Sequence, residues 1–301
     1  MSVDEDQVNV NSPQVELDAR RLIKFLSRYP AIAVAFSGGV DSSVVLAAAQ
    51  RADLSRVVAV TAVSPSVAQW QLELSQQIAS QVAVEHWVVE THEISLPEYQ
   101  RNDSQRCFFC KQTLYRMISN EIRRRSGSDA DDPATLFHVA SGTNHDDLGD
   151  HRPGIRAGVE QEVLTPLATL GLGKSRVRAL ADHWRLPNHD LPASPCLASR
   201  IAYGVSVTRE RLAKIEEAEG WLAQQGFREF RVRLHEGELA RIEVAREEME
   251  RIVQLEVSGK LSNRLREIGF RFITLDLQGF RSGSMNRELV EIGVKPKALG
   301  T

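Results

Sequence analysis

The 301-residue sequence has only three cysteines, no long apolar run and little net charge. An odd number of cysteines without a secretion signal argues against a disulfide framework, so each cysteine needs another explanation. No apolar segment approaches the roughly 20 residues of a membrane-spanning helix, and the acidic, polar first residues do not resemble a signal peptide. The net charge of −3 argues against binding nucleic acid through bulk positive charge. We therefore expect a cytoplasmic globular protein.

Short apolar segments alternate with helical patterns over the first half of the chain. Buried strands are predicted at residues 31–36, 57–63, 84–90 and 136–141. The helices between them are predicted at residues 42–50, 66–82 and 107–125. Strands that are apolar throughout and alternate with helices predict an α/β fold, a doubly wound parallel sheet with helices on both faces.

The pattern changes beyond about residue 205. A helix, two alternating strands and a last strand are predicted at residues 208–224, 230–234, 240–245 and 271–277. The two alternating strands flank His235-Glu236-Gly237-Glu238, which indicates a hairpin. We therefore expect two domains, an α/β domain over residues 1–205 and a smaller α+β domain over residues 206–301.

A glycine-containing loop follows the first predicted strand. Phe36 ends the strand, and Ser37-Gly38-Gly39-Val40-Asp41-Ser42 leads into a helix. Unpaired N–H groups at a helix N-terminus attract anions, and glycines let a phosphate approach the backbone closely. The lysine that a Walker A loop has after its second glycine is missing, and Asp41 suits a magnesium ion that accompanies the phosphate. The loop therefore predicts a nucleotide site of another type.

A polar stretch follows the fourth predicted strand. Backbone and short polar groups for a nucleotide are available at Gly142, Thr143 and Asn144, and candidate magnesium ligands are Asp146, Asp147 and Asp150. Because the carboxyl ends of parallel strands meet at one edge of a sheet, we expect this stretch to join the glycine loop. The alternative is a polar loop whose Asn and Asp side chains cap the next turn. Lys174 begins a later helix, where the helix dipole disfavours lysine unless it serves an anion.

The cysteines occur in two different settings. Cys196 lies in a proline-rich loop, and Ser199 and Arg200 in the same turn favour its reactive thiolate form. A small buried hydrophobe is the alternative for such a cysteine. Cys107 and Cys110 form a Cys-x-x-Cys pair at the start of a helix, which is more often a metal or redox pair than two unbonded core cysteines. A zinc site would need a further ligand, and nothing in the sequence selects between His151 and His189.

Two arginines mark the strand at 230–234. Alternation places Arg231 and Arg233 on one face of this strand, about 7 Å apart. Paired guanidinium groups suit a phosphate or a carboxylate. The alternative is a strand face that is simply exposed to solvent.

Taken in order, these stretches resemble a known family. The hexapeptide SGGVDS resembles the PP-loop of the N-type ATP pyrophosphatase superfamily. With RCFFCK, GTNHDDLGDHRPG, PCLASRIAYG, FRVRLHEGELARIEV and GFRSGSMN, the chain resembles the LarE family of ATP-dependent sacrificial sulfur transferases over about residues 15–290. This family makes the thiocarboxylates of the nickel-pincer nucleotide. The combination of motifs is specific to the family, whereas SGGVDS alone indicates only the superfamily.

The resemblance implies an activity and a set of site residues. ATP, with Mg²⁺, would adenylylate a carboxylate of pyridinium-3,5-biscarboxylic acid mononucleotide, and the thiolate of Cys196 would displace AMP. The implied ATP-binding residues are Phe36, Ser37, Gly38, Gly39, Asp41, Ser42, Gly142, Thr143, Asn144, Asp146 and Lys174. The implied residues for the substrate phosphate are Ser199, Arg200, Arg231, Arg233, Arg281 and Glu219. The family also implies a homo-oligomer, a hexamer in this case.

The source of the sulfur stays open between two routes. In the sacrificial route, the Cβ–S bond of Cys196 breaks and dehydroalanine remains in the protein. Some family members resemble this chain in having three cysteines that hold a [4Fe–4S] cluster, and the corresponding residues are Cys107, Cys110 and Cys196. We expect the cluster route. The alternative enzyme is a PP-loop tRNA thiolase, which the charge of −3 and the lack of an RNA-binding domain disfavour. The intact SGGVDS loop argues against a degenerate protein that only binds nucleotide as a sensor or scaffold.

Overall fold

The computed structural model describes residues 12–126, 136–149, 153–192 and 194–281. Residue contacts divide the chain into two compact units. The first unit comprises Met1–Ser64, Gln69–His92 and Cys107–Ser194, and the second comprises Pro65–Ala68, Glu93–Arg106 and Pro195–Thr301. Within these described ranges, no helix combines the length and the apolar character needed to cross a membrane. The assignment of substrate binding and oligomerisation to residues 206–301 stays a prediction.

The first unit contains a parallel sheet of four strands in the order β3-β2-β1-β4. The strands are β1 (Ala31–Ala35), β2 (Arg56–Val63), β3 (Glu85–Glu90) and β4 (Phe137–Ser141). All three strand pairings are parallel, and Ala35, for example, lies between Val60 of β2 and Ser141 of β4. These pairings confirm the predicted parallel sheet. Apolar strands such as β1 favour this arrangement, because a parallel sheet has both faces covered by helices.

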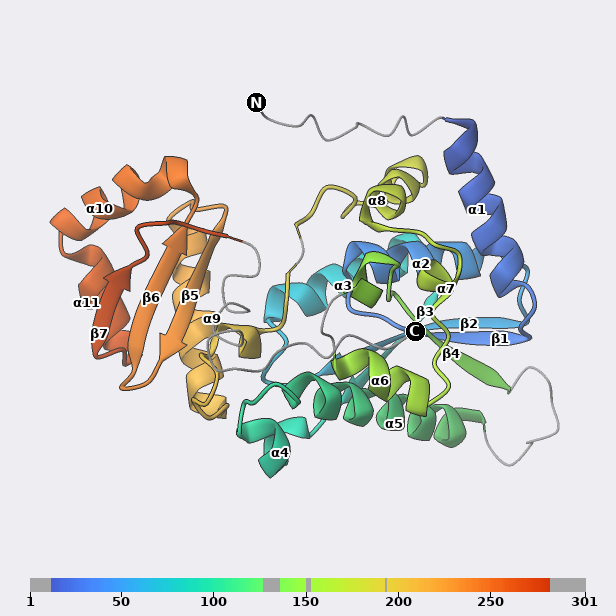
Figure 1. Cartoon of the computed structure of the whole chain (residues 1–301), viewed down its shortest axis with the longest axis horizontal. Coiled ribbons are helices and arrows are strands. Elements are labelled where there is room, and N and C mark those ends of the chain that lie inside the picture. Colours follow the sequence, from blue (N-terminus) through green and yellow to red (C-terminus); the bar gives the residue numbers. More distant parts are fainter. Residues whose placement is uncertain (1–11, 127–135, 150–152, 193, 282–301) are drawn as a thin grey trace. The chain divides into compact units, whose positions relative to one another are not determined.

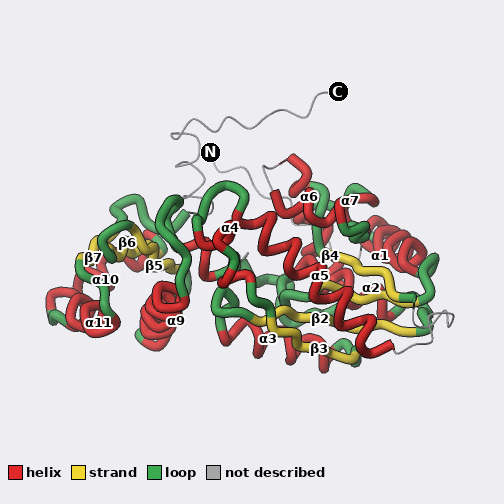
Figure 2. Tube along the Cα trace, turned by 90° about the horizontal axis from the view of Figure 1, so that it is seen from below, coloured by secondary structure: helices red, strands yellow, loops and turns green. Residues whose placement is uncertain are grey.

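Helices cover both faces of this sheet (Figure 2). The helices of the first unit are α1 (Pro13–Leu26), α2 (Val40–Gln50), α3 (Gln69–Gln81), α5 (Arg106–Ser126, from Cys107 onward), α6 (Pro153–Glu160), α7 (Pro166–Thr169) and α8 (Lys174–His183). Successive side chains of β1 point to opposite faces. Ile32 and Val34 pack with α1, α2 and α8, whereas Ala33 and Ala35 pack with α5. The α/β, doubly wound architecture follows from this two-sided burial.

The order of the strands defines a switch point at β1. The chain passes from β1 to β2 and β3 on one side, and then returns to add β4 on the other side. In open α/β sheets, ligands bind outside the carboxyl ends of the strands at such a reversal. The segments that leave this edge are the loop after β1 and the polar stretch after β4, so the fold places both at the expected position.

The second unit contains a smaller sheet in the order β5-β6-β7 (Figure 1). Its elements are η1 (Glu93–Ser95), α4 (Pro97–Gln100), η4 (Leu197–Arg200), α9 (Arg209–Gln224), β5 (Phe230–His235), β6 (Leu239–Val244), η5 (Arg246–Glu248), α10 (Met249–Val257), α11 (Lys260–Ile268) and β7 (Phe272–Leu275). β5 and β6 form the predicted antiparallel hairpin, and β7 is parallel to β6. Val232 and Leu234 are fully buried in its core. The alternate positions of β5 and β6 carry charged side chains, and these form part of the site below.

Candidate functional site

The loop after β1 has the geometry of an anion site. Gly38 has a φ of +72°, and a Cβ atom there would lie 3.2 Å from the backbone nitrogen of Ser75 in α3. Glycine therefore fits this position for both its backbone angle and its lack of a side chain. α2 begins directly afterwards, with Gly39 as its N-cap, and the first N–H groups of a helix lack partners within the helix. The loop thus presents backbone donors at the positive end of α2.

Serine hydroxyls line the same loop. The Oγ atoms of Ser37 and Ser42 lie 3.3 Å apart, and Ser42 donates to the carbonyl oxygen of Gly39 at 3.0 Å. Ser43, the next residue of α2, donates to the same carbonyl at 2.9 Å. Ser37 and Gly39 are exposed, whereas Ser42 is buried. The exposed part of the loop can therefore meet a ligand while the buried hydroxyls hold its shape.

The polar stretch after β4 contacts the start of α2, as expected from the fold. Asn144 is buried and its Nδ2 donates to Oδ1 of Asp41 at 3.1 Å. Gly142 lies so close to α2 that a Cβ atom would be 2.6 Å from the backbone nitrogen of Ser42. The Oγ1 of Thr143 lies 3.1 Å from the Oγ of Ser141 at the end of β4. The two sequence-predicted halves of the nucleotide site therefore lie together.

Asp146 and Lys174 interact in a way that the sequence did not reveal. The carboxylate of Asp146 accepts the backbone N–H of Lys174, the first residue of α8, at 2.7 Å. The anion at this helix N-terminus is thus a side chain of the protein, and the side chain of Lys174 is exposed. Asn144 Oδ1 accepts the N–H groups of Asp146 and Asp147 at 3.0 and 3.2 Å, which is the capping role weighed as the alternative. Asp150 and His151 lie outside the described residues.

The Cys-x-x-Cys pair lies in the first turn of α5. Cys107 is exposed, Cys110 is half-buried, and all three cysteines of the chain are free thiols. α6 packs on this turn, because a Cβ atom at Gly154 would be 3.4 Å from the carbonyl oxygen of Cys107 and the guanidinium of Arg156 lies 4.1 Å from the ring centre of Phe108. Among the residues that the structure places, no group of three or more His, Cys, Asp or Glu side chains is arranged to hold a metal ion. The three-cysteine set draws on both units and stays a prediction.

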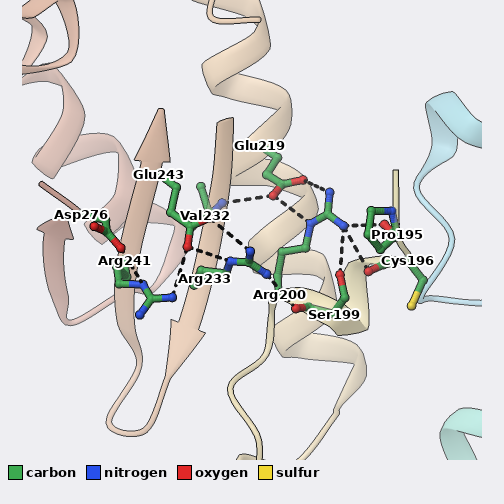
Figure 3. Close-up of polar contacts among 10 residues, drawn as sticks. All are labelled: Pro195, Cys196, Ser199, Arg200, Glu219, Val232, Arg233, Arg241, Glu243 and Asp276. Carbon is green, nitrogen blue, oxygen red and sulfur yellow. Dashed lines mark hydrogen bonds and ion pairs between the residues drawn. The ribbon is translucent and has the colours of Figure 1, made fainter. Parts of the chain in front are cut away.

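Cys196 begins a tight turn in the second unit (Figure 3). Its following residue, Leu197, donates its N–H to the carbonyl of Ser66 at 2.8 Å. The guanidinium of Arg200 donates to the carbonyl of Pro195, to the carbonyl of Cys196 at 3.2 Å and to the hydroxyl of Ser199 at 3.2 Å. These contacts shape the backbone of the turn, whereas Figure 3 shows the sulfur of Cys196 directed away from Arg200.

Two buried ion pairs lie beside this turn (Figure 3). Glu219 of α9 accepts from Arg200 at 3.1 and 3.3 Å and from the N–H of Val232 at 3.1 Å. Glu243 of β6 accepts from Arg233 at 3.2 and 3.1 Å, and Arg233 also donates to the carbonyl of Ser199 at 3.0 Å. The alternative of an exposed strand face is wrong, because Arg231 is 5% exposed and Arg233 is 2% exposed.

Arg231 differs from these paired arginines. Its guanidinium stacks on the ring of Phe280 at 4.7 Å, and within the described chain it donates no hydrogen bond and forms no ion pair. Burial, reinforced by the neighbouring charges of Arg233 and Arg200, lowers the pKa of Arg231 to about 10. The Nε of Arg281, the residue after Phe280 in sequence, is also buried and has no hydrogen-bond partner among the described residues. An anionic ligand would relieve the Arg231 guanidinium, because a buried cation is costly without an acceptor.

Sequence reasoning missed several residues that hold these segments in place. Asn102 is fully buried and donates to the carbonyls of Ala202 and Val205 at 2.8 and 2.9 Å. Arg106 donates to Oδ1 of Asn102 and to the carbonyl of Ala198 at 2.8 Å. Arg106 and Ala198 both belong to the second unit, so this contact lies within that unit. Their contacts are remote in sequence, and no local pattern identifies them.

The fold and the site together define a class, a doubly wound α/β protein with a glycine loop and a helix N-terminus at its switch point. No protein-family model matches the chain. It is 31% identical to the pyridinium-3,5-bisthiocarboxylic acid mononucleotide synthase of Lactiplantibacillus plantarum over 271 residues, 90% of this chain and 94% of that protein. It is also 37% identical over 281 residues to the uncharacterized protein slr1717 of Synechocystis sp., covering 92% of this chain and all of that protein. The chain therefore belongs to the family of these synthases, the LarE family, which supports the PP-loop assignment of residues 37–42.

Proposed function

We propose that the chain is an ATP-dependent sulfur transferase that converts pyridinium-3,5-biscarboxylic acid mononucleotide into a thiocarboxylate, releasing AMP and pyrophosphate, in the synthesis of the nickel-pincer nucleotide. The observation that carries the proposal is the similarity along nearly the whole L. plantarum synthase, whose name specifies a bisthiocarboxylic acid mononucleotide. The geometry supports both halves of the reaction, since one unit has an anion loop and the other has a cysteine beside buried arginines.

The glycine loop serves the activation step. A carboxylate oxygen of the substrate attacks the α-phosphorus of ATP, the bond from that phosphorus to the bridging oxygen breaks, and pyrophosphate leaves. The N–H groups of the loop and the N-terminus of α2 hold the β- and γ-phosphates. We propose that Asp41, whose carboxylate accepts a hydrogen bond from Asn144, binds the Mg²⁺ ion that neutralises them. The carboxylate thereby gains AMP as a leaving group.

Cys196 serves the sulfur-transfer step. If Cys196 itself supplies the sulfur, its thiolate attacks the adenylylated carboxyl carbon, the bond from that carbon to the phosphate oxygen breaks, and AMP leaves with the electron pair. A thioester to the protein results. In the sacrificial route, loss of the Cα proton and cleavage of the Cβ–S bond release the thiocarboxylate and leave dehydroalanine. The contacts of Arg200 and Ser66 with the turn hold the cysteine backbone for this sequence of steps.

The number of cysteines suits the cluster route, because a [4Fe–4S] cluster takes thiolate ligands. We propose that Cys107, Cys110 and Cys196 hold it, since the chain has no disulfide and three thiols that are at least partly accessible. When bound, a [4Fe–4S] cluster with three thiolate ligands would supply sulfide from the iron that lacks a protein ligand, so that Cys196 would not be consumed.

We propose that Arg231, with Arg281, binds the phosphate of the mononucleotide. The change Arg231→Met should raise the KM for this substrate by at least about tenfold, because a charge-assisted contact is lost. The same change should leave the temperature of unfolding unchanged or higher, because it removes a buried cation that has no acceptor in the described chain. Steady-state kinetics and thermal unfolding measure the two effects. Arg228→Met, at an exposed position before β5, is the matched control; an equal rise in KM there, or unfolding of the Arg231 variant, would contradict this role.

The whole proposal is tested by one anaerobic experiment. The purified protein is incubated with ATP, Mg²⁺ and the pyridinium dicarboxylate mononucleotide, and pyrophosphate, thiocarboxylate, iron, sulfide and intact protein mass are measured. We expect both products, bound iron and an unchanged protein mass. Products from iron-free protein that loses the mass of one hydrogen sulfide at Cys196 would establish the sacrificial route instead. If ATP is not cleaved when the mononucleotide is present, the proposed function is wrong.

A further inference from the structure

Asn188 is a fully buried side chain that contacts the glycine loop from a distant part of the sequence. It follows α8 and is 0% exposed. Its Nδ2 donates to the carbonyl oxygen of Gly38 at 2.7 Å and to Oγ of Ser43 at 3.0 Å. Ser43 in turn donates to the carbonyl of Gly39. The amide of Asn188 thus holds the Gly38 carbonyl directly and the Gly39 carbonyl through Ser43.

The orientation of the peptide group between Gly38 and Gly39 decides whether its N–H or its carbonyl oxygen faces an anion. In a trans peptide, the C=O and N–H groups point in opposite directions. Because Asn188 holds the Gly38 carbonyl, the N–H of Gly39 faces the other side, where it donates to Oγ of Ser37 at 3.4 Å. Neither glycine has a Cβ atom to prevent rotation of this peptide, and Gly38 already occupies the left-handed region. A rotated peptide would present a carbonyl oxygen to the phosphate and repel it.

The other end of the Asn188 side chain is not satisfied by the described residues. Its Oδ1 is buried and accepts no hydrogen bond within the described residues. A buried acceptor without a donor lowers the stability of the folded state. The amide cannot be turned to relieve this, because the carbonyl of Gly38 only accepts hydrogen bonds and needs the nitrogen facing it. A local cost of this kind is typical of a position that serves function.

We propose that Asn188 is a positioning residue, which fixes the Gly38–Gly39 peptide so that its N–H points at the β- and γ-phosphates of ATP. The inference rests on the proposed function for the identity of the ligand. The proposal distinguishes ATP from AMP, because only the β- and γ-phosphates would contact the peptide that Asn188 orients. Loss of the amide weakens ATP binding and spares AMP binding.

The test compares two nucleotides and two variants. Asn188→Ala removes the donor, and Asn188→Asp keeps the shape but places a carboxylate oxygen against the Gly38 carbonyl. Calorimetric titration of each protein with Mg²⁺–ATP and with AMP gives the two Kd values. We expect the Kd for ATP to rise at least about tenfold in Asn188→Ala and further in Asn188→Asp, while the Kd for AMP changes less than about twofold.

Two controls separate positioning from general destabilisation. Asp18→Asn weakens a partly buried ion pair between α1 and Arg176 of α8, which involves no residue of the glycine loop, and should lower the unfolding temperature without changing the ratio of the two Kd values. Ser43→Ala keeps the bond from Asn188 to Gly38 and should have the smaller effect on ATP. Unchanged ATP binding in both Asn188 variants, or an equal loss for AMP, overturns the inference alone. Failure of the unmodified protein to bind ATP overturns the proposed function as well.

Discussion

Replacing Cys196 by alanine should abolish formation of the thiocarboxylate while pyrophosphate is still released from ATP. Both sulfur routes need this thiolate, either as the atom that is transferred or as one of the proposed cluster ligands. The proposed adenylylation uses the glycine loop of the other unit and would not require the sulfur. We expect product formation to fall by at least about 10³-fold, the scale of losing a nucleophile. Mass spectrometry of the mononucleotide and an enzyme-coupled pyrophosphate assay measure the two steps.

Cys107→Ala is the informative companion to this variant. Under the cluster route, the Cys107→Ala protein should lose the ability to turn over more than once. Under the sacrificial route, it should still transfer one sulfur atom per chain. Cys107 is exposed in the first turn of α5, so its replacement leaves no cavity. Full thiocarboxylate formation by the Cys196→Ala protein would show that another residue carries the sulfur, and would contradict the role given to Cys196.

The second large effect is expected from Gly142→Ala. The added Cβ would lie 2.6 Å from the nitrogen of Ser42 and 2.9 Å from the carbonyl carbon of Asp41, and both are backbone atoms that cannot rotate away. Either β4 or the start of α2 must shift, which costs about 1–3 kcal/mol of folding free energy. A displacement of about 1 Å at a phosphate-binding loop can cost 10²-fold in rate. We therefore expect kcat/KM for ATP to fall about 10²-fold and the unfolding temperature to decrease.

Gly149→Ala provides a matched control for that variant. This glycine follows in the same polar stretch, in η3 (Asp146–Gly149), and a Cβ atom there would have no neighbour within 4 Å. The control should retain the kinetics and the unfolding temperature of the unmodified protein. A Gly142→Ala protein that behaves like the control would show that α2 does not pack on the β4 stretch as described.

The elements of the fold could be predicted because their signals are local. Each strand of the large sheet begins and ends within one residue of the range expected from its apolar run. The helix over α3 begins at Gln69, later than the expected residue 66, because Pro65–Ala68 joins the second unit. Periodicity shows that a segment is buried, but not which unit buries it.

The candidate site could be predicted only where its residues follow strand ends. Ser37 to Ser42 and Gly142 to Asn144 were found because the topology brings such segments together. Alternation placed Arg231 and Arg233 on one face of β5, but it could not show that Glu243 pairs with Arg233 and leaves Arg231 unpaired within the described chain. The role of Asn188 could not be predicted, because its contact with Gly38 spans 150 residues of sequence. Long-range polar partners of this kind are set by the packed structure and not by local sequence.

The interleaved course of the chain has a consequence for how the protein forms on the ribosome. The second unit takes Pro65–Ala68 from the end of β2 and Glu93–Arg106 from the end of β3, and receives its remaining residues only from Pro195 onward. The hydrogen bond from the amide of Asn102 to the carbonyl of Val205 can therefore form only after another 103 residues have been synthesised. A nascent chain that stops before Pro195 contains Asn102 and Arg106 but lacks the carbonyl groups of Ala198, Ala202 and Val205 to which they donate. Contacts between residues so far apart in sequence are characteristic of slow folding. While the first unit is being synthesised, Pro65–Ala68 and Glu93–Arg106 still lack the rest of the second unit.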